Sequence, residues 1–100
     1  MALLDDMKLV LRVSTDAYDS EVNLLIEAAK ADMLRVGVLP DMVNPPVGED
    51  EAPLVIQAIA CYCKAHFGYD NSEAARFERS YRQTVTDLLN SSANLAAEEA

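Results

Sequence analysis

The feature that most constrains the fold is an apolar run of helix-forming length in the second half of the chain. Residues 54–67 read LVIQAIACYCKAHF, in which only Gln57, Lys64 and His66 are strongly polar. A surface helix would carry a charged side opposite its apolar stripe, and this segment has no such side. The run is also too short to span a bilayer, which needs roughly 20 apolar residues. We therefore predict a central helix, covered only in part by others, whose remaining apolar surface contacts another subunit.

Helical periodicity in the rest of the chain predicts an all-α fold, a compact bundle of four helices. The expected helices cover residues 4–12, 18–36, 51–67 and 72–89. Gly37 and Gly68 are expected to end two of them, and Pro53 fits a first turn. Within the central helix we expect the best-buried positions to include Ile59, Tyr62 and Cys63. The apolar faces of the other three helices consist of Leu4, Met7, Val10 and Leu11, of Val22, Leu25, Ile26, Ala29, Met33 and Val36, and of Ala74, Phe77, Tyr81, Val85 and Leu88.

A long proline-containing loop, residues 38–49, is expected between the second and third helices. Its apolar side chains, among them Met42, Val43 and Val47, are not needed in a solvated linker. Either they pack on the core of their own subunit or they contact a partner, and we take these three as candidate subunit-interface residues. Residues 1–90 are expected to form a single helical domain, and residues 91–100 a flexible acidic tail. The loop and the tail should be the least ordered parts of an isolated subunit and should order on assembly.

The net charge of −9 argues against nucleic-acid binding by counterion release, because an acidic chain repels phosphates. The few basic residues are nevertheless partly grouped. Arg76, Arg79 and Arg82 follow one another at spacings of three on one side of a predicted helix, and they are the other candidate subunit-interface residues. The overall charge favours carboxylates of a neighbouring copy over phosphates as their partners. Pairing within the helix, with Glu73 and Glu78, is an equal alternative.

No residue pattern predicts a catalytic, cofactor-binding or metal site. The single histidine, His66, follows Cys63 at a spacing that metal sites use, but two ligands do not make a zinc site. Cys61 points to the opposite side of the helix from Cys63, so the two are expected to be free thiols. Acidic clusters such as Asp5-Asp6 lie at expected helix starts, where the helix dipole explains them. We therefore expect a protein that is not an enzyme and needs no cofactor. No segment has the pattern of a signal peptide, so we expect the chain to fold in the cytoplasm of its cell.

The order and spacing of several short motifs resemble the head–tail connector proteins of tailed bacteriophages. That family opens on a Leu-acid-acid-apolar-Lys-x-x-Leu-Arg pattern, then has a short acidic turn and a helix that reads Leu-Ile-x-Ala-Ala. In the second half it has an apolar helix preceded by proline and ending in an aromatic residue, then a Tyr-acid-Asn turn. The matching positions cover roughly residues 3–90. They are Leu4, Asp5, Asp6, Met7, Lys8, Leu11, Arg12, Asp16, Asp19, Leu25, Ile26, Ala28, Ala29, Pro53, Phe67, Tyr69, Asp70 and Asn71.

The resemblance implies a structural role in the virion without catalysis. Such proteins form a ring, usually a dodecamer, under the portal protein of a filled head. The ring extends the DNA channel and presents a platform for a neck stopper or tail completion protein. The resemblance thus implies self-association and contact with those partners, passage of DNA without specific binding, and no membrane. The protein would lie in the head–tail neck of the virion, after assembly in the host bacterial cytoplasm.

Two alternatives belong to other classes of protein. A neck stopper or tail completion protein would also be a phage component, but such proteins tend to be β-rich, which the helical pattern opposes. A small acidic regulator that mimics DNA and blocks a nucleic-acid-binding protein would fit the negative charge. It would be a monomer or dimer with acidic residues arrayed along one surface.

Overall fold

The computed structural model describes residues 3–46, 48–67 and 72–90, and the regular structure of these residues is helical. Four long helices are α1 (Leu3–Leu11), α2 (Asp19–Val36), α4 (Pro53–His66) and α5 (Ala74–Leu89), and two short ones are η1 (Asp16–Tyr18) and α3 (Pro40–Val43). The predicted all-α class is confirmed, and each long helix begins and ends within two residues of its predicted bounds. The expected acidic tail and the expected stop at Gly68 lie outside the described residues.

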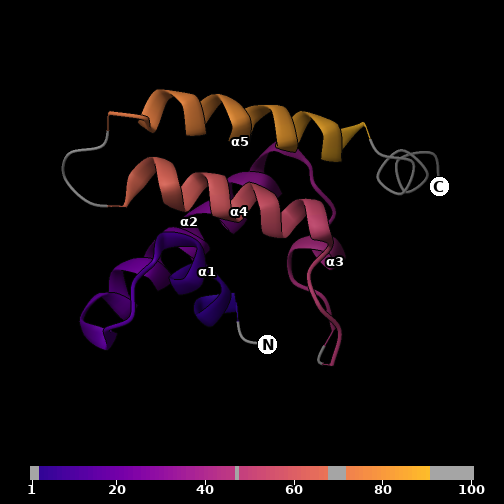
Figure 1. Ribbon diagram of the computed structural model, residues 1–100. Coiled ribbons are helices and arrows are strands. Elements are labelled where there is room, and N and C mark those ends of the chain that lie inside the picture. The colour runs from indigo at the N-terminus through magenta and orange to yellow at the C-terminus, as the bar shows by residue number, and fades with distance from the viewer. Residues whose placement is uncertain (1–2, 47, 68–71, 91–100) are drawn as a thin grey trace.

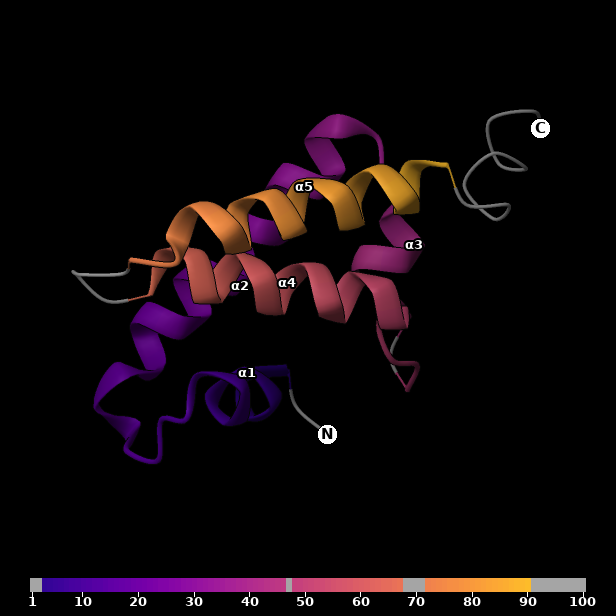
Figure 2. The same ribbon diagram turned by 45° about the horizontal axis from the view of Figure 1, so that its top comes forward.

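The apolar helix α4 lies at the centre, as its sequence predicts. It packs most extensively on α5, then on α2, and also on α1. In Figures 1 and 2, α1 and α5 lie on opposite sides of α4, and α2 crosses behind it in the view of Figure 1. The three surrounding helices therefore contact different sides of one helix, which explains why α4 has no charged side.

The core confirms two of the three burial predictions for α4 and corrects the third. Ile59 and Cys63 are fully buried. Tyr62 is only partly buried, so its expected place among the best-buried residues is wrong. Tyr62 lines a groove whose α2 wall includes the short side chains of Ala28 and Ala31, so part of its surface remains open. Tyr81 of α5 is the deeply buried tyrosine instead, with 4% of its surface exposed.

The segment expected as a loop between α2 and α4 contains α3 and packs partly on the subunit's own core. Val38 and Val43 are buried, so for these two residues the structure favours the first of the two alternatives. Met42 is partly buried against the same core, and Val47 lies outside the described residues. Lys30 of α2 holds the segment from the other side, because its Nζ donates to Asn44 Oδ1 at 3.2 Å and Glu51 Oε2 at 3.1 Å.

Two helices end in the same backbone motif with different residues at its left-handed position. At the end of α2, Gly37 has φ of 109° and donates to the carbonyl oxygen of Leu34 at 3.2 Å, while Val38 donates to that of Met33. At the end of α1, Arg12 has φ of 59°, and the backbone N–H groups of Arg12 and Val13 make the equivalent bonds. Glycine adopts this conformation cheaply, whereas arginine does so at a cost. Arg12 therefore sits in a strained backbone conformation.

Replacing Arg12 by glycine should stabilise the isolated subunit by about 0.5–1 kcal/mol. The left-handed conformation costs an L-residue roughly 1–2 kcal/mol, which exceeds the roughly 0.5–1 kcal/mol of extra chain entropy that glycine loses on folding. Urea unfolding followed by circular dichroism measures the difference. As controls, Arg12→Ala keeps the strain and should give no gain. Gly37→Ala should destabilise, although its new Cβ would meet only Leu89 Cδ2 at 3.7 Å. A loss of stability in Arg12→Gly would contradict the assignment of strain.

Candidate functional site

Residues of the family-like opening motif form a clamp at the start of the chain. Lys8 Nζ lies 2.9 Å from Asp16 Oδ1 and 2.9 Å from Asp19 Oδ1. These hydrogen bonds, to Asp16 and then to Asp19, raise the pKa of Lys8 above its ordinary value, and the bond from Lys8 lowers the pKa of Asp16. Thr15 caps the short η1 helix between them by accepting from the backbone N–H of Ala17. The clamp fixes α1 against the beginning of α2, so the orientation of α1 is set by the motif.

Two of the three arginines that the sequence places on one side of α5, Arg76 and Arg82, have different surroundings in the structure. Arg76 lies with its Cζ 4.9 Å from the centroid of the Phe77 ring, and Lys64 Nζ of α4 lies 5.3 Å from the same centroid. Arg82 lines a groove next to α2 instead. Both arginines also have an acidic neighbour on their own helix, Arg76 with Glu73 at 3.3 Å and Arg82 with Glu78 at 3.9 Å. Arg76 and Arg82 thus each pair with a glutamate of their own helix, and most of each arginine side chain is still exposed to solvent.

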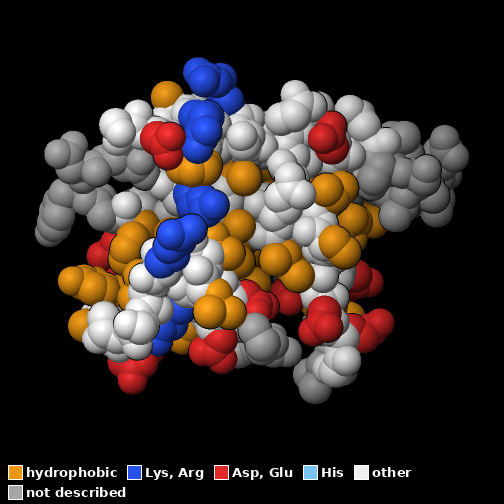
Figure 3. All heavy atoms as spheres, in the orientation of Figure 1, with side chains coloured by type: hydrophobic (Ala, Val, Ile, Leu, Met, Phe, Trp, Pro, Cys, Tyr) orange, Lys and Arg blue, Asp and Glu red, His pale blue; other side chains and the backbone are white. Residues whose placement is uncertain are grey.

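Several basic side chains lie together on the face of the molecule that Figure 3 shows. Figure 3 shows them in a column that crosses the face from α5 over α4 toward α1, with hydrophobic side chains on both sides of it. Acidic side chains gather along the lower margin of the same view. Other acidic side chains lie in the upper part of the view, one group of them directly beside the basic column, so the separation of charges on this face is partial.

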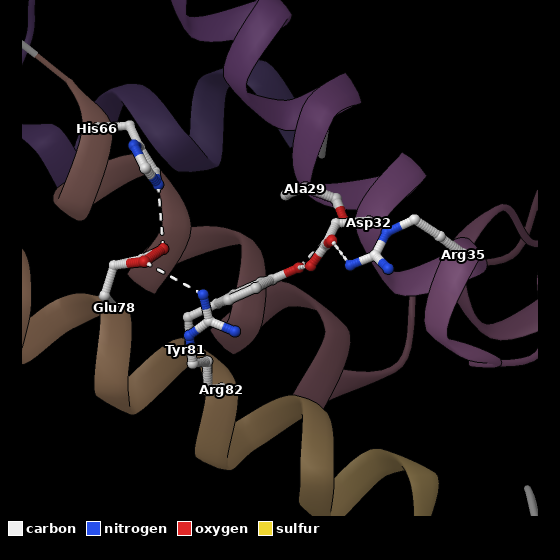
Figure 4. A network of polar contacts seen from close by, with 7 residues as sticks. All are labelled: Ala29, Asp32, Arg35, His66, Glu78, Tyr81 and Arg82. Carbon is white, nitrogen blue, oxygen red and sulfur yellow. Dashed lines mark hydrogen bonds and ion pairs between the residues drawn. The ribbon is translucent and has the colours of Figure 1, made fainter.

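A groove of about 530 Å³ lies between α2, α4 and α5. It continues between α2 and α5 into a second hollow of about 320 Å³. Figure 4 shows the polar contacts along its floor and walls. The residues that line the larger part are Ala28, Ala31, Asp32 and Arg35 from α2, Tyr62 and His66 from α4, and Glu78, Tyr81 and Arg82 from α5.

Asp32 is the centre of the polar contacts in this groove. Its Oδ2 accepts from the Tyr81 hydroxyl at 2.8 Å, and its Oδ1 accepts from Arg35 Nη2 at 2.7 Å. Burial raises the pKa of Asp32, but the hydrogen bonds from Arg35 and Tyr81 outweigh that effect, so the pKa lies below its ordinary value. Burial and the hydrogen bond to Asp32 raise the pKa of Tyr81. Asp32 is therefore ionised and Tyr81 neutral at physiological pH, and together they fix α5 against α2.

The two arginines of the groove lie on either side of the Tyr81–Asp32 bond (Figure 4). The Arg35 side chain is 72% exposed and the Arg82 side chain 78% exposed. A guanidinium group has five N–H donors, and each of these groups has one nitrogen directed at a neighbouring acid. Both guanidinium groups therefore keep further N–H donors, and most of each side chain is open to solvent.

Two large apolar side chains lie outside the helix faces that the sequence predicts as core. Leu9 of α1 is 70% exposed and Leu24 of α2 is 72% exposed. Neither residue belongs to the apolar faces that helical spacing predicts. Such residues can be recognised in a sequence as large apolar residues that lie outside the apolar stripe of an amphipathic helix. Burial in their own subunit does not explain them, which makes them candidates for contact with another chain.

The thiols and the histidine do not form a site with one another. Cys63 is buried and burial raises its pKa to about 12, and burial also raises the pKa of Cys61. Both cysteines are free, as the spacing predicts. His66 Nε2 lies 3.3 Å from Glu78 Oε1, at the edge of the groove. Within residues 3–46, 48–67 and 72–90, no group of three or more His, Cys, Asp and Glu side chains is arranged to hold a metal ion.

The described helices also include none with the length and apolar character that crossing a membrane requires.

Comparison with known proteins gives one match. A family model described as phage connector protein matches residues 3–94. No curated protein and no solved structure matches the chain. The matched residues include the clamp at the start of α1, the central helix α4 and the whole of the groove. Because the match covers nearly the entire chain, the protein belongs to the phage connector family, a family of structural proteins of the bacteriophage particle.

Proposed function

We propose that the protein is the subunit of a ring in the neck of a tailed bacteriophage. The ring lies under the portal protein, extends the DNA channel and joins the head to the tail. Its partners are further copies of the same chain, in a dodecamer, the portal protein, and a neck stopper or tail completion protein. The observation that carries the proposal is membership of the phage connector family over residues 3–94.

The surface of the subunit supports ring formation. A closed ring needs a head-to-tail contact in which two different surfaces of one subunit meet. The column of basic side chains in Figure 3 and the acidic margin of the same face are different surfaces of opposite charge. Charge complementarity of this kind selects partners and orients them more than it adds affinity.

The net charge supports a channel through which DNA slides. A subunit charge of −9 gives a dodecamer on the order of a hundred negative charges. Phosphates are repelled by such a wall, whereas a basic wall would hold them by releasing counterions. The basic residues of the subunit then serve contacts between proteins. A DNA mimic needs an acidic array along one surface, and the basic column on the face in Figure 3 does not favour that alternative.

Attachment to heads tests this function directly. Purified protein is added to DNA-filled heads that contain the portal protein but lack this chain, and the necks are imaged by electron microscopy. We expect an added ring under the portal, retention of DNA and the ability to accept tails. Heads without the portal protein are the control and should bind no ring. Portal-containing heads that bind none of the protein, at concentrations that saturate other neck components, would contradict the proposal.

A further inference from the structure

We infer that a projecting acidic arm of one subunit docks on a cluster of basic side chains at the opposite end of a neighbouring copy. The arm consists of residues 44–46 and 48–51, between α3 and α4. The basic cluster consists of Lys64 and Arg76, which lie over the ring of Phe77, together with Arg79 one turn later. The contact joins two subunits of the proposed ring, and the inference rests on that ring.

The arm is fixed both at its base and at its tip. At the base, Lys30 Nζ of α2 donates to Asn44 Oδ1 at 3.2 Å and to Glu51 Oε2 at 3.1 Å, so one buried lysine holds the two ends of the arm together. At the tip, the backbone N–H of Glu49 donates to the carbonyl oxygen of Pro46 at 3.0 Å and closes a turn. Figures 1 and 2 show this segment extending away from the helices. An arm held in this way has less freedom to lose on binding than a slack loop.

The exposed charges of the arm are negative. Glu49 and Asp50 are exposed, whereas Glu51 is turned inward to Lys30. The chain has no lysine or arginine from residue 36 to residue 63, so the arm carries no positive charge of its own. Figure 3, in the orientation of Figure 1, shows acidic side chains where the arm leaves the body of the molecule. The arm therefore presents two carboxylates to a partner.

The basic cluster gathers three positive charges at the end of α4 and the start of α5. Lys64 Nζ lies 5.3 Å and Arg76 Cζ 4.9 Å from the centroid of the Phe77 ring, which attracts both cations and so holds them near each other. Arg79 is exposed on the same side of α5. An ion pair at 3.3 Å from Arg76 brings one acid, Glu73, against these three basic residues.

The nearby Glu78 belongs to the groove side of α5. Its Oε1 lies 3.3 Å from His66 Nε2, and its Oε2 lies 3.9 Å from Arg82 Nη2, as Figure 4 shows. The charge of Glu78 is therefore offset by Arg82. Among the residues that the structure describes, the basic cluster keeps more positive than negative charge after both ion pairs are counted.

The arm and the basic cluster lie at opposite ends of the central helix. The arm comes just before α4, whereas Lys64 is in the last turn of that helix. The 14 residues of α4 rise about 20 Å in all. Because Lys30 holds the base of the arm, a subunit cannot place its arm on its own cluster. A contact between these two surfaces is head-to-tail, which is the geometry that a ring requires.

A second copy is the partner that the charges favour. Copies of a chain with a net charge of −9 repel one another in most orientations. The orientation that brings the arm of one copy to the basic cluster of the next places opposite charges together, so charge complementarity selects it. DNA is the rival polyanion, and the net charge of the subunit opposes its binding.

Two charge-reversed variants and their mixture test the contact. The arm variant carries Glu49→Lys and Asp50→Lys, and the cluster variant carries Arg76→Glu and Arg79→Glu. Each alone should join portal-containing heads on the order of tenfold less than the wild type, because like charges then meet at every interface. An equal mixture of the two should restore joining. In the mixture, a reversed arm meets a reversed cluster and an unchanged arm meets an unchanged cluster, in alternating order around the ring.

A variant with the same change of charge elsewhere is the matched control. Asp5→Lys with Glu27→Lys reverses two exposed acids that lie outside the arm. Mixing this variant with the cluster variant should not restore joining, because it supplies no reversed arm. Circular dichroism of each isolated variant confirms that it is folded.

Cross-linking locates the contact. Two variants are made in a background of Cys61→Ala that retains the buried Cys63. One carries Asp50→Cys, and the other carries Ser80→Cys, an exposed position one turn after Arg76, with a tag that changes its size. After mixing, assembly on portal-containing heads and oxidation, we expect covalent dimers of the two variants. Asn23→Cys, an exposed position of α2, replaces Ser80→Cys as the control and should give far fewer dimers.

The outcomes separate this contact from the proposed ring. Wild-type protein that joins heads, while the mixture joins no better than the two variants alone, overturns the contact and leaves the ring standing. Cross-links from Asp50→Cys to the portal protein, in place of a second copy, also overturn it. A cluster variant that joins heads normally but no longer retains DNA would make DNA the partner of the cluster and overturn the contact too. Wild-type protein that neither joins heads nor self-associates overturns both.

Discussion

Replacing Ile59 by alanine should destabilise the subunit by roughly 2–5 kcal/mol, the range for large-to-small substitutions in well-packed cores. Ile59 lies in the middle of α4 and is fully buried in the core cluster. The loss would be a large part of the roughly 5–15 kcal/mol by which small domains are stable. Urea unfolding of the isolated subunit, followed by circular dichroism, measures it.

A matched substitution on the same helix distinguishes a packing effect from a helix-propensity effect. Leu54 lies in the first turn of α4 and is 38% exposed. Leu54→Ala should therefore cost clearly less than Ile59→Ala. A cost for Ile59→Ala below about half a kilocalorie, outside the range for buried positions, would mean that α4 is not the centre of the core.

Changing Arg76, Arg79 and Arg82 together to glutamate should leave the subunit folded and prevent it from joining portal-containing heads. The three side chains are largely exposed, so their replacement changes little inside the subunit. Individual exposed ion pairs contribute only about 0–1 kcal/mol, but a ring repeats each of them at every interface. Circular dichroism of the isolated variant and head binding by light scattering provide the two measurements.

The control for the arginine variant keeps the charge and changes the geometry. Changing the same three residues to lysine should preserve joining if charge is what matters, with weaker binding where the planar guanidinium group is needed. Normal assembly of the triple glutamate variant at physiological salt would contradict a role of the three arginines in assembly. They would then be solvated side chains that pair only with Glu73 and Glu78 of their own helix.

The helices could be predicted from the sequence because the residues that begin and end a helix lie within the helix or next to it. The end of α2 at Gly37 follows from the backbone freedom of one residue, and the start of α4 follows from Pro53 in its first turn. The end of α1 is different. Arg12 has the left-handed backbone conformation, although it is not a glycine. The sequence therefore predicts the end of the helix near this residue but not its backbone strain.

The burial of individual side chains and the groove could not be predicted as well, because they depend on which side chains of other helices lie opposite. Tyr62 and Tyr81 are both aromatic residues on apolar helix faces, and their different burial depends on the side chains that other helices place around them. The groove takes its residues from α2, α4 and α5, and no local pattern states that Asp32 will meet Tyr81. The spacing of Arg76, Arg79 and Arg82 predicts that they share one side of α5. It cannot predict that Arg82, and neither of the other two, lines the groove beside α2.

The central position of α4 has a consequence for the size of the assembly. In the proposed ring, α4 separates the side of each subunit that α1 forms from the side that α5 forms. When neighbours meet through two sides of a subunit, the angle between those sides is the rotation from one subunit to the next, and a closed ring requires a whole number of such rotations in a full turn. Substitutions that tilt α1 on α4, for example at the buried Met7, would then change the number of subunits or open the ring into a helix, with the contact itself intact.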